Sequence, residues 1–477
     1  MNALPSNRTW FRIHSFTGVV TGLMLFVICF SGTFAVVSHE LDWLANPALR
    51  VAPQAQQASW GELVEAVERE YPDGQVLWIS APLYSVSTAM ALVDFEGRGM
   101  LKIHVDPYTA EITGQSSFVD FQRFIRNFHM NLFGLGGFGI YLVSAFSITL
   151  LISLVAALFF YRRWWTRFFR FRTGRPRVVL SESHKTAGLW SLWFVALMAL
   201  TGIWYLVEMT RLDFVDGKFS HAGTGPSAVH AVPEAETSAG PDGLPLDALI
   251  ERIAEARPDL DIKMVGPAVS HPGALYVEGD AGHVLVRSRA NFVHVDKADG
   301  RILYSQDAAE LPLYWRWSET ADPLHFGDFG GLWSKAIWFL FGLVLCGLIF
   351  TGTWLHASRL AASSGGQARH RWPGTWAAMA VTLLVLVASV RAGFGQAREA
   401  YGTTIDGVRE LPSLTAGVQA LIVGWVVLTL LLVAVWIVLL WRPRRNRAVP
   451  DAPPDLPALE NRFDRRSRAG HTARGVR

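Results

Sequence analysis

The sequence predicts an α-helical membrane protein, in which six transmembrane helices carry two α+β modules outside the membrane. Three observations support this class. Hydrophobic residues make up 51% of the 477 residues and the mean hydropathy is +0.25, which is high for a soluble protein of this length. Apolar runs long enough to cross a bilayer recur along the chain. One long polar segment lies between the first and second runs and another between the third and fourth, and the sequence of the first half recurs in the second.

The apolar runs define the candidate transmembrane helices, because about 20 apolar residues span the hydrocarbon core of a bilayer. They cover residues 14–37, 129–161, 184–207, 333–357, 375–391 and 417–441. The first run is longer than the core of a signal peptide, and no small-x-small cleavage motif follows it. We therefore expect it to be a retained membrane anchor.

The distribution of positive charge predicts the orientation. The loop 162–183 begins with RRWWTRFFRFRTGRPR, which carries seven arginines and no acidic residue. Such basic loops stay in the cytoplasm. The N-terminus, 1–13, and the tail, 442–477, are basic too, so six spans place both termini in the cytoplasm of a bacterial inner membrane. The net charge of +3 gives no argument for a nucleic-acid partner, and we expect none.

Two long polar segments, 40–128 and 208–332, then lie in the periplasm. Neither contains a cysteine, because Cys29 and Cys346 both fall within apolar runs. The sequence has no disulfide framework and no CxxCH motif for covalent haem attachment. We expect the two cysteines to act as small core residues.

An internal repeat relates the two halves of the first 360 residues. In the polar segments, LVEAVEREYPDGQV from Leu63 matches LIERIAEARPDLDI from Leu249, and IHVDPYTAEI at 103–112 matches VHVDKADGRI at 293–302. Each segment therefore predicts a helix followed by strands, an α+β module. His104 and His294 fall in the second match, and we expect both on the surface of a strand. The first and third spans match at His14 and His184, Gly18 and Gly188, and Gly32 and Gly202, each pair 170 residues apart.

Four histidines stand at the ends of these repeated spans. The first and third spans run outward, so His14 and His184 lie near the cytoplasmic surface. The second and fourth run inward, so His129 in FHMNLFGLGG and His325 in LHFGDFGG lie near the periplasmic surface. A duplicated bundle brings equivalent positions together, and two facing imidazoles suit one metal centre. Haem iron is the natural candidate because it accepts two axial ligands.

A single histidine at the end of a span is usually an interfacial residue, but four at repeat-equivalent positions favour ligands. His39 and His356 also lie near span ends, lack a histidine counterpart in the other repeat, and are second choices. Glycines near the four histidines would let a flat macrocycle approach the helix backbone. These are Gly18, Gly22, Gly188, Gly134, Gly136, Gly137, Gly327, Gly330 and Gly331.

The order of these motifs resembles the PepSY-associated transmembrane family, which includes iron-regulated inner-membrane proteins and ferrisiderophore reductases. The resemblance covers about residues 8–360 and includes SHELDWLANP at 38–47 and TGTWLHASR at 351–359. It implies PepSY-like periplasmic modules and a membrane oxidoreductase with two b-type haems. His14 and His184 would hold one haem, and His129 and His325 the other; no further catalytic residue is assigned. The last two spans lie outside the resemblance.

The function that follows is electron transfer across the membrane to a periplasmic ferric chelate, such as a ferrisiderophore or the same compound on a binding partner. A chelator that binds Fe(III) tightly and Fe(II) weakly releases its metal after one electron. No GxGxxG or flavin motif is present, so the donor would be a separate cytoplasmic reductase or a quinol. Two alternatives stay open: a non-redox PepSY sensor or regulatory module, and a transporter component whose histidines relay protons.

Overall fold

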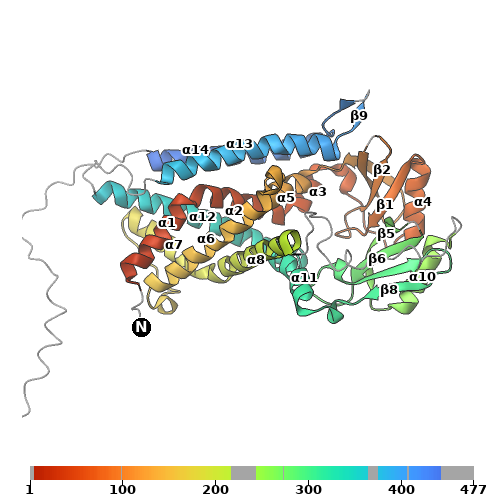
Figure 1. The fold of residues 1–477 in the computed structure, drawn as a ribbon, viewed down its shortest axis with the longest axis horizontal. Coiled ribbons are helices and arrows are strands. Elements are labelled where there is room, and N and C mark those ends of the chain that lie inside the picture. Colours follow the sequence, from red (N-terminus) through yellow and green to blue (C-terminus); the bar gives the residue numbers. More distant parts are fainter. Residues whose placement is uncertain are drawn as a thin grey trace, which may run out of the picture.

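A computed structural model describes residues 5–97, 99–215, 243–271, 273–363, 374–405 and 408–441. The molecule is elongated, with a helical bundle at one end and a β-sheet domain at the other (Figure 1). The tail from 442 to 477 and the segment 216–242 lie outside the described residues.

Five helices in the described part of the chain are long and apolar enough to cross a membrane. They are α6 (Gly139–Phe160), α8 (Leu192–Thr210), α12 (Gly331–Ser363), α13 (Gly374–Tyr401) and α14 (Ala416–Trp441). A sixth crossing exists if α1 (Asn7–Val20) and α2 (Gly22–Val36) form one span; their axes are bent by 67°. The expected class, an α-helical multi-pass membrane protein, is confirmed.

The first and third apolar runs are broken helices, whereas the sequence suggested continuous ones. The first breaks at Thr21, and the third breaks at Ser191, between α7 (Pro176–Trp190) and α8. The Thr21 hydroxyl donates to the Thr17 carbonyl at 2.5 Å, and the Ser191 hydroxyl donates to the Ala187 carbonyl at 2.7 Å. Hydroxyl groups that bond back to the preceding turn bend helices. The two breaks are 170 residues apart, so the repeat includes them.

The second apolar run also begins later than expected, because His129 belongs to a separate helix, α5 (Phe121–Asn131). Every residue from 132 to 137 has positive φ, which no helix tolerates. Likewise, His325 lies on α11 (Leu313–Phe326), and Gly327 and Gly331, with φ of +70° and +63°, separate it from α12. The glycines that follow these two histidines therefore turn the chain between two helices.

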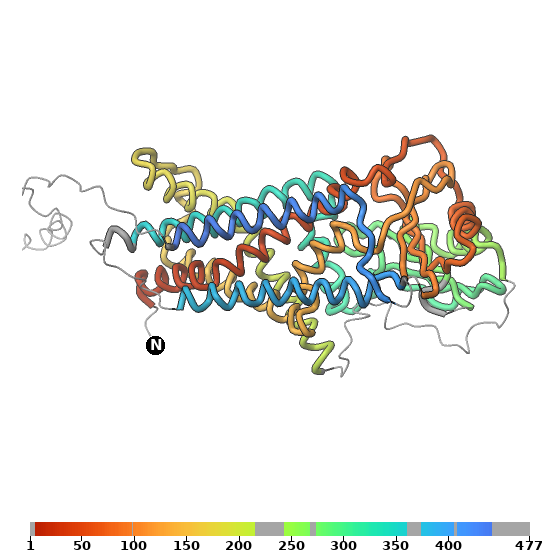
Figure 2. Tube along the Cα trace, turned by 90° about the horizontal axis from the view of Figure 1, so that it is seen from above, coloured from red at the N-terminus to blue at the C-terminus, as the bar shows by residue number. Residues whose placement is uncertain are grey.

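The long helices of each repeat pack mainly against helices of the other repeat. The first repeat's α2 packs along α12 of the second, and α8 of the second packs along α6 of the first. In each repeat the short histidine-bearing helix lies against the first span: α5 against α2, and α11 against α8. The additional helices α13 and α14 run along one side of this bundle (Figures 1 and 2). There Trp436 of α14 is buried against Phe26 and Gly22 of α2.

The two polar segments each form a helix and four strands. The first contains α4 (Trp60–Glu70), β1 (Gly74–Ser80), β2 (Ala89–Phe95), β3 (Gly99–Val105) and β4 (Ile112–Ser117). The second contains α10 (Leu246–Ala256), β5 (Asp261–His271), β6 (Ala274–Asp280), β7 (Phe292–Asp296) and β8 (Ile302–Gln306). They are not separate modules. Antiparallel pairing of β1 with β5 joins them into one eight-stranded sheet of order β4-β3-β2-β1-β5-β6-β7-β8.

Both α4 and α10 cover the same face of this sheet and share one apolar core with it. The Asp247 carboxylate of α10 joins the two helices, since it accepts hydrogen bonds from the Ser59 hydroxyl at 2.7 Å and the Gly61 amide at 2.8 Å. His104 and His294 point to the other face, where their exposures are 2% and 1%. The expectation that they lie on the surface is wrong, because this second face is covered as well.

Smaller elements complete the chain. The helix α3 (Ser38–Ala45) links α2 to the sheet domain, and the hairpin β9 (Thr404–Ile405) and β10 (Val408–Arg409) links α13 to α14. Short 3-10 turns are η1 (Pro47–Leu49), η2 (Leu135–Gly137), η3 (Trp164–Thr166), η6 (Ser288–Ala290) and η7 (Ala308–Glu310), and η4 (Arg211–Val215) is a π turn.

Candidate functional site

The four histidines singled out by the repeat lie together in two pairs. The ring centroids of His14 on α1 and His184 on α7 are 6.4 Å apart, with ring planes at 68°. Those of His129 on α5 and His325 on α11 are 6.1 Å apart, with ring planes at 30°. Figure 1 shows α1 and α7 at the end of the bundle away from the sheet, and α5 and α11 at the end beside it. We call these the inner and the outer pair.

Hydrogen bonds at Nδ1 orient both rings of the inner pair. Nδ1 of His14 lies 3.0 Å from the Ser153 carbonyl oxygen. Nδ1 of His184 lies 2.9 Å from the Thr351 hydroxyl, whose own proton is donated to the Gly347 carbonyl at 2.8 Å. A carbonyl can only accept and the Thr351 hydroxyl has a carbonyl to which it donates, an arrangement that favours the proton on both Nδ1 atoms.

The outer pair has the same arrangement. Nδ1 of His129 lies 3.0 Å from the Ile28 carbonyl oxygen and 3.2 Å from the Ser31 hydroxyl. Nδ1 of His325 lies 2.7 Å from the Thr201 hydroxyl, which donates to the Leu197 carbonyl at 2.8 Å. Protonation at Nδ1 again leaves the lone pair on Nε2.

All four Nε2 atoms lack a hydrogen-bond partner among the described residues. An imidazole whose Nδ1–H is held by an acceptor and whose Nε2 is free has the form of a metal ligand. Two such rings on one metal would have centroids roughly 6 Å apart, because each metal–nitrogen bond is about 2 Å long. The described residues include no cluster of three or more histidine, cysteine or carboxylate side chains fit to hold a metal. A metal at either pair must therefore bring its other ligands, as haem iron does.

Glycines allow helix backbone to lie against one ring of each pair. A Cβ atom at Gly32 would stand 2.6 Å from Cε1 of His129, and one at Gly352 would stand 3.2 Å from Cε1 of His184. Beside the inner pair, a Cβ at Gly18 would meet nothing within 4 Å. Backbone therefore packs on the histidines themselves, and open space adjoins the inner pair at Gly18.

A cavity of about 270 Å³ adjoins the outer pair. His129 and His325 both line it, and apolar side chains of α2, α6, α8 and α12, including Trp338, form much of its wall. Its charged lining residues are Arg126, Glu208, Arg287, Arg289 and Asp322, with Tyr205 beside them, and Thr33, Ser144 and Ser147 add hydroxyls along the spans. The charged residues come from α5, α8, α11 and the sheet domain, so charge gathers at the side of the cavity where the bundle meets the sheet.

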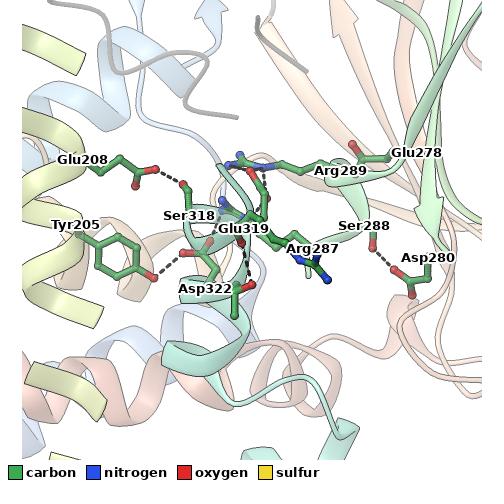
Figure 3. Close-up of polar contacts among 12 residues, drawn as sticks. Tyr205, Glu208, Glu278, Asp280, Arg287, Ser288, Arg289, Ser318, Glu319 and Asp322 are labelled. Atoms are coloured by element: carbon green, nitrogen blue, oxygen red, sulfur yellow. Dashed lines mark hydrogen bonds and ion pairs between the residues drawn. The ribbon is translucent and has the colours of Figure 1, made fainter. Parts of the chain in front are cut away.

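Much of this polar lining belongs to a buried ionic network (Figure 3). Arg287 binds Glu319 at 2.7 Å and also pairs with Asp322, while Arg289 binds Glu319 at 3.0 Å. We call these four residues the arginine–acid cluster. The Tyr205 hydroxyl donates to Asp322 at 2.5 Å, and the Ser318 hydroxyl donates to Glu208. The cluster fastens the sheet domain, through Arg287 and Arg289, to the helix that carries His325.

Carboxylates from two elements hold the helix that carries His129. Asp42 of α3 accepts the backbone amides of Phe121 and Gln122 at 2.9 and 2.8 Å, and Asp120 accepts that of Arg123 at 2.7 Å. Burial, together with the nearby Asp120 carboxylate, raises the pKa of Asp42. The first turn of α5 is thus capped by Asp120 and anchored to α3 by Asp42.

The second-choice histidines belong to neither pair. His39 lies on α3, where burial and the charge of Lys335 lower its pKa to about 4. His356 lies on α12, one turn beyond Gly352. The four histidines matched by the repeat are the ones that pair, and His39 and His356 lie outside both pairs. Of the tryptophans on the repeat spans, Trp338 lines the outer cavity and contacts Trp193 edge to face, with ring centroids 5.4 Å apart.

Sequence reasoning missed the groups that orient the rings. Ser31 and Thr201 are themselves 170 residues apart and each precedes a matched glycine, Gly32 or Gly202. This hydroxyl–glycine pair was visible in FSGTF and LTGIW. The arginine–acid cluster carried no comparable signal, because its members are scattered between 287 and 322.

These features define a class of protein: a multi-pass membrane protein with paired histidines at both ends of a duplicated bundle. The chain belongs to the PepSY-associated TM region family, whose model matches residues 11–359, and the suspected membership is confirmed. The matched range ends before α13 and α14. A Pseudomonas aeruginosa protein named uncharacterized protein PA4219 is 30% identical over 270 residues. That match covers 51% of this chain and 65%, less than two thirds, of the relative.

Proposed function

We propose that the chain is a di-haem b-type electron-transfer protein of a bacterial inner membrane, which reduces a ferric chelate, such as a ferrisiderophore, in the periplasm. One observation carries the proposal: four histidines form two pairs at opposite ends of the bundle. In each ring Nδ1 is hydrogen-bonded, and Nε2 has no partner among the described residues. Haem iron bound at each pair would supply a one-electron couple on each side of about 30 Å of hydrocarbon.

The residues of the chain hold and orient such a group. His14 and His184 would bind it at the inner end, and His129 and His325 at the outer end. The carbonyls of Ser153 and Ile28 and the hydroxyls of Thr351 and Thr201 fix each ring. Two histidines on one haem iron would keep other ligands off the metal and would favour electron transfer over oxygen binding.

The proposed direction of transfer follows the charge distribution. The basic loop 162–183 lies at the end of the bundle away from the sheet, so that end faces the cytoplasm in this proposal (Figure 2). The donor is then a cytoplasmic reductase or a quinol, and the acceptor meets the sheet domain in the periplasm. A quinol would give two electrons and two protons, and two Fe(III) ions would each take one electron.

The test measures the absorption spectrum of the purified protein and the number of haems bound per chain. The purified protein should show a reducible b-type spectrum with two haems per chain. His184→Ala and His325→Ala should each remove about half the haem, and the first should abolish reduction from the cytoplasmic side. His325→Ala should stop reduction of an external ferric chelate while the inner haem stays reducible. A colourless wild-type protein rejects the proposal and leaves the sensor and proton-relay alternatives. Full haem in His184→Ala would move the inner ligand to His356.

A further inference from the structure

Arg126 stands next to the outer histidine pair. It lies three residues before His129 on α5, and residues at this spacing share one face of a helix. Both side chains line the same cavity, together with His325. Because α5 begins at the sheet domain, Arg126 lies one turn nearer to the sheet than the histidine.

The guanidinium of Arg126 has no carboxylate partner within the 4.0 Å of an ion pair among the described residues. Its Nε lies 3.4 Å from the sulfur of Met130, a weak acceptor, and its guanidinium carbon lies 4.9 Å from the centroid of the Phe326 ring. The two other arginines that line the cavity differ, because Arg287 and Arg289 are both held by carboxylates of the arginine–acid cluster.

Neighbouring acids are already engaged. Both oxygens of Asp322 are bound, one by the Tyr205 hydroxyl and the other by Arg287. Glu208 accepts the Ser318 hydroxyl. A guanidinium that lines an interior cavity without an anion is unfavourable, and a bidentate carboxylate is the partner that its planar donors fit best. The expected occupant therefore brings an acid group of its own.

We propose that Arg126 binds a carboxylate of the cofactor held by His129 and His325, namely a propionate of haem. The inference rests on the proposed function and assigns a role to a residue outside the ligand set. The lining of the site supports it: the walls along the spans are mostly apolar, with only the hydroxyls of Thr33, Ser144 and Ser147, and the charged side chains lie beside the sheet. Haem has the same division, an apolar macrocycle with two carboxylates at one edge. Arg126 thereby sets which edge faces the sheet, and its charge stabilises the reduced iron.

The test compares Arg126→Gln and Arg126→Lys with Arg123→Gln as the matched control. Arg123 lies one turn earlier on α5, where its guanidinium carbon is 4.3 Å from the Phe118 ring and outside the cavity lining. Each purified protein is stripped and reloaded either with native haem or with its dimethyl ester, which lacks both carboxylates. Haem retention and the two midpoint potentials are measured by spectroelectrochemistry.

In wild type, esterification should weaken retention at one of the two sites about tenfold. Arg126→Gln with native haem should lose a similar amount and lower one potential by about 59 mV, the value for a tenfold change in a one-electron equilibrium. The ester should cause little further loss in that variant, because the two changes remove the same contact. Arg126→Lys should restore most of the potential, and Arg123→Gln should match wild type.

Two outcomes overturn the inference. One is an unchanged potential and retention in Arg126→Gln. The other is a full ester effect that persists in Arg126→Gln, which would assign the arginine to another anion, such as a carboxylate of the acceptor. If Arg126→Gln does not fold, Arg126→Met, which keeps the length of the side chain without its charge, is measured in its place, and the same two outcomes overturn the inference. Wild-type protein that binds no haem would instead reject the proposed function.

Discussion

Gly32 lies against His129 so closely that a Cβ atom at position 32 would stand 2.6 Å from Cε1 of the imidazole ring. The same ring is tied through Nδ1 to Ile28, one turn earlier on the same helix. It is therefore held between a hydrogen bond and helix backbone, which restrict its movement on the side of α2.

Gly32→Ala should displace the His129 ring and weaken retention of the outer haem about tenfold, the lower end of the usual effect of disturbing a metal ligand's support. The measurement is haem content after dilution into haem-free detergent. Gly347→Ala is the matched control, because a Cβ at that position of α12 meets nothing within 4 Å. Equal retention in the two variants would show that the contact does not constrain the ligand.

Thr201→Val removes the acceptor for Nδ1–H of His325 and keeps the shape of the side chain. We expect roughly 10- to 100-fold weaker haem retention at the outer pair and a higher midpoint potential, since the hydrogen bond makes the imidazole a stronger donor to ferric iron. Thr201→Ser should behave like wild type. Thr210→Val on the same helix removes only a hydroxyl bonded back to Leu206 and should change neither quantity. If Thr201→Val changes neither haem retention nor the midpoint potential, another group fixes the His325 ring.

The proposed orientation places α4 and α10 outside the cell membrane and the basic loop inside. Glu65 and Glu251 are exposed, repeat-equivalent positions on these helices, and Arg172 is an exposed position in the loop. Single cysteines at the first two should react with a membrane-impermeant maleimide on spheroplasts, and a cysteine at Arg172 only after lysis. Labelling of the Arg172 position on intact spheroplasts would reverse the topology.

Acid should weaken the sheet domain through His104. Burial, with a contribution from Lys102, lowers its pKa to about 4 from an ordinary value near 6.5. The unfolded chain then binds the proton more readily, so the stabilisation is complete above pH 6.5 and is lost as pH falls towards 4. The loss is at most about 3 kcal/mol.

Amide hydrogen exchange in β2 to β4 at several pH values measures this effect. His104→Gln should flatten the dependence between pH 6.5 and 4. His283→Gln, which changes a half-exposed histidine in the same domain, should leave it in place. A pH dependence that is unchanged in His104→Gln would assign the acid sensitivity to other groups.

The membrane class, the repeat and the two histidine pairs were all predictable from the sequence. An apolar run of membrane length is stable only as a transmembrane helix, because its backbone must be hydrogen-bonded within the bilayer. In a duplicated sequence, residues at matching positions occupy equivalent positions in the fold. The repeat offset of 170 residues is enough to predict that His14 pairs with His184. It also contained the helix breaks at Thr21 and Ser191, although a hydrophobic pattern does not register a hydroxyl that bends a helix.

The rest depended on the tertiary structure. The pairing of β1 with β5 joins two strands that are distant in the sequence. Because backbone groups make its hydrogen bonds, the side chains do not identify the partner strand. The location of His129 on α5, before the span, depends on six consecutive positive φ angles that the letters LFGLGG only allow. The sequence by itself determined which histidines pair and at which end. Only packing decided what holds them, because the acceptors of Nδ1 and the surroundings of Arg126 come from helices far apart in the chain.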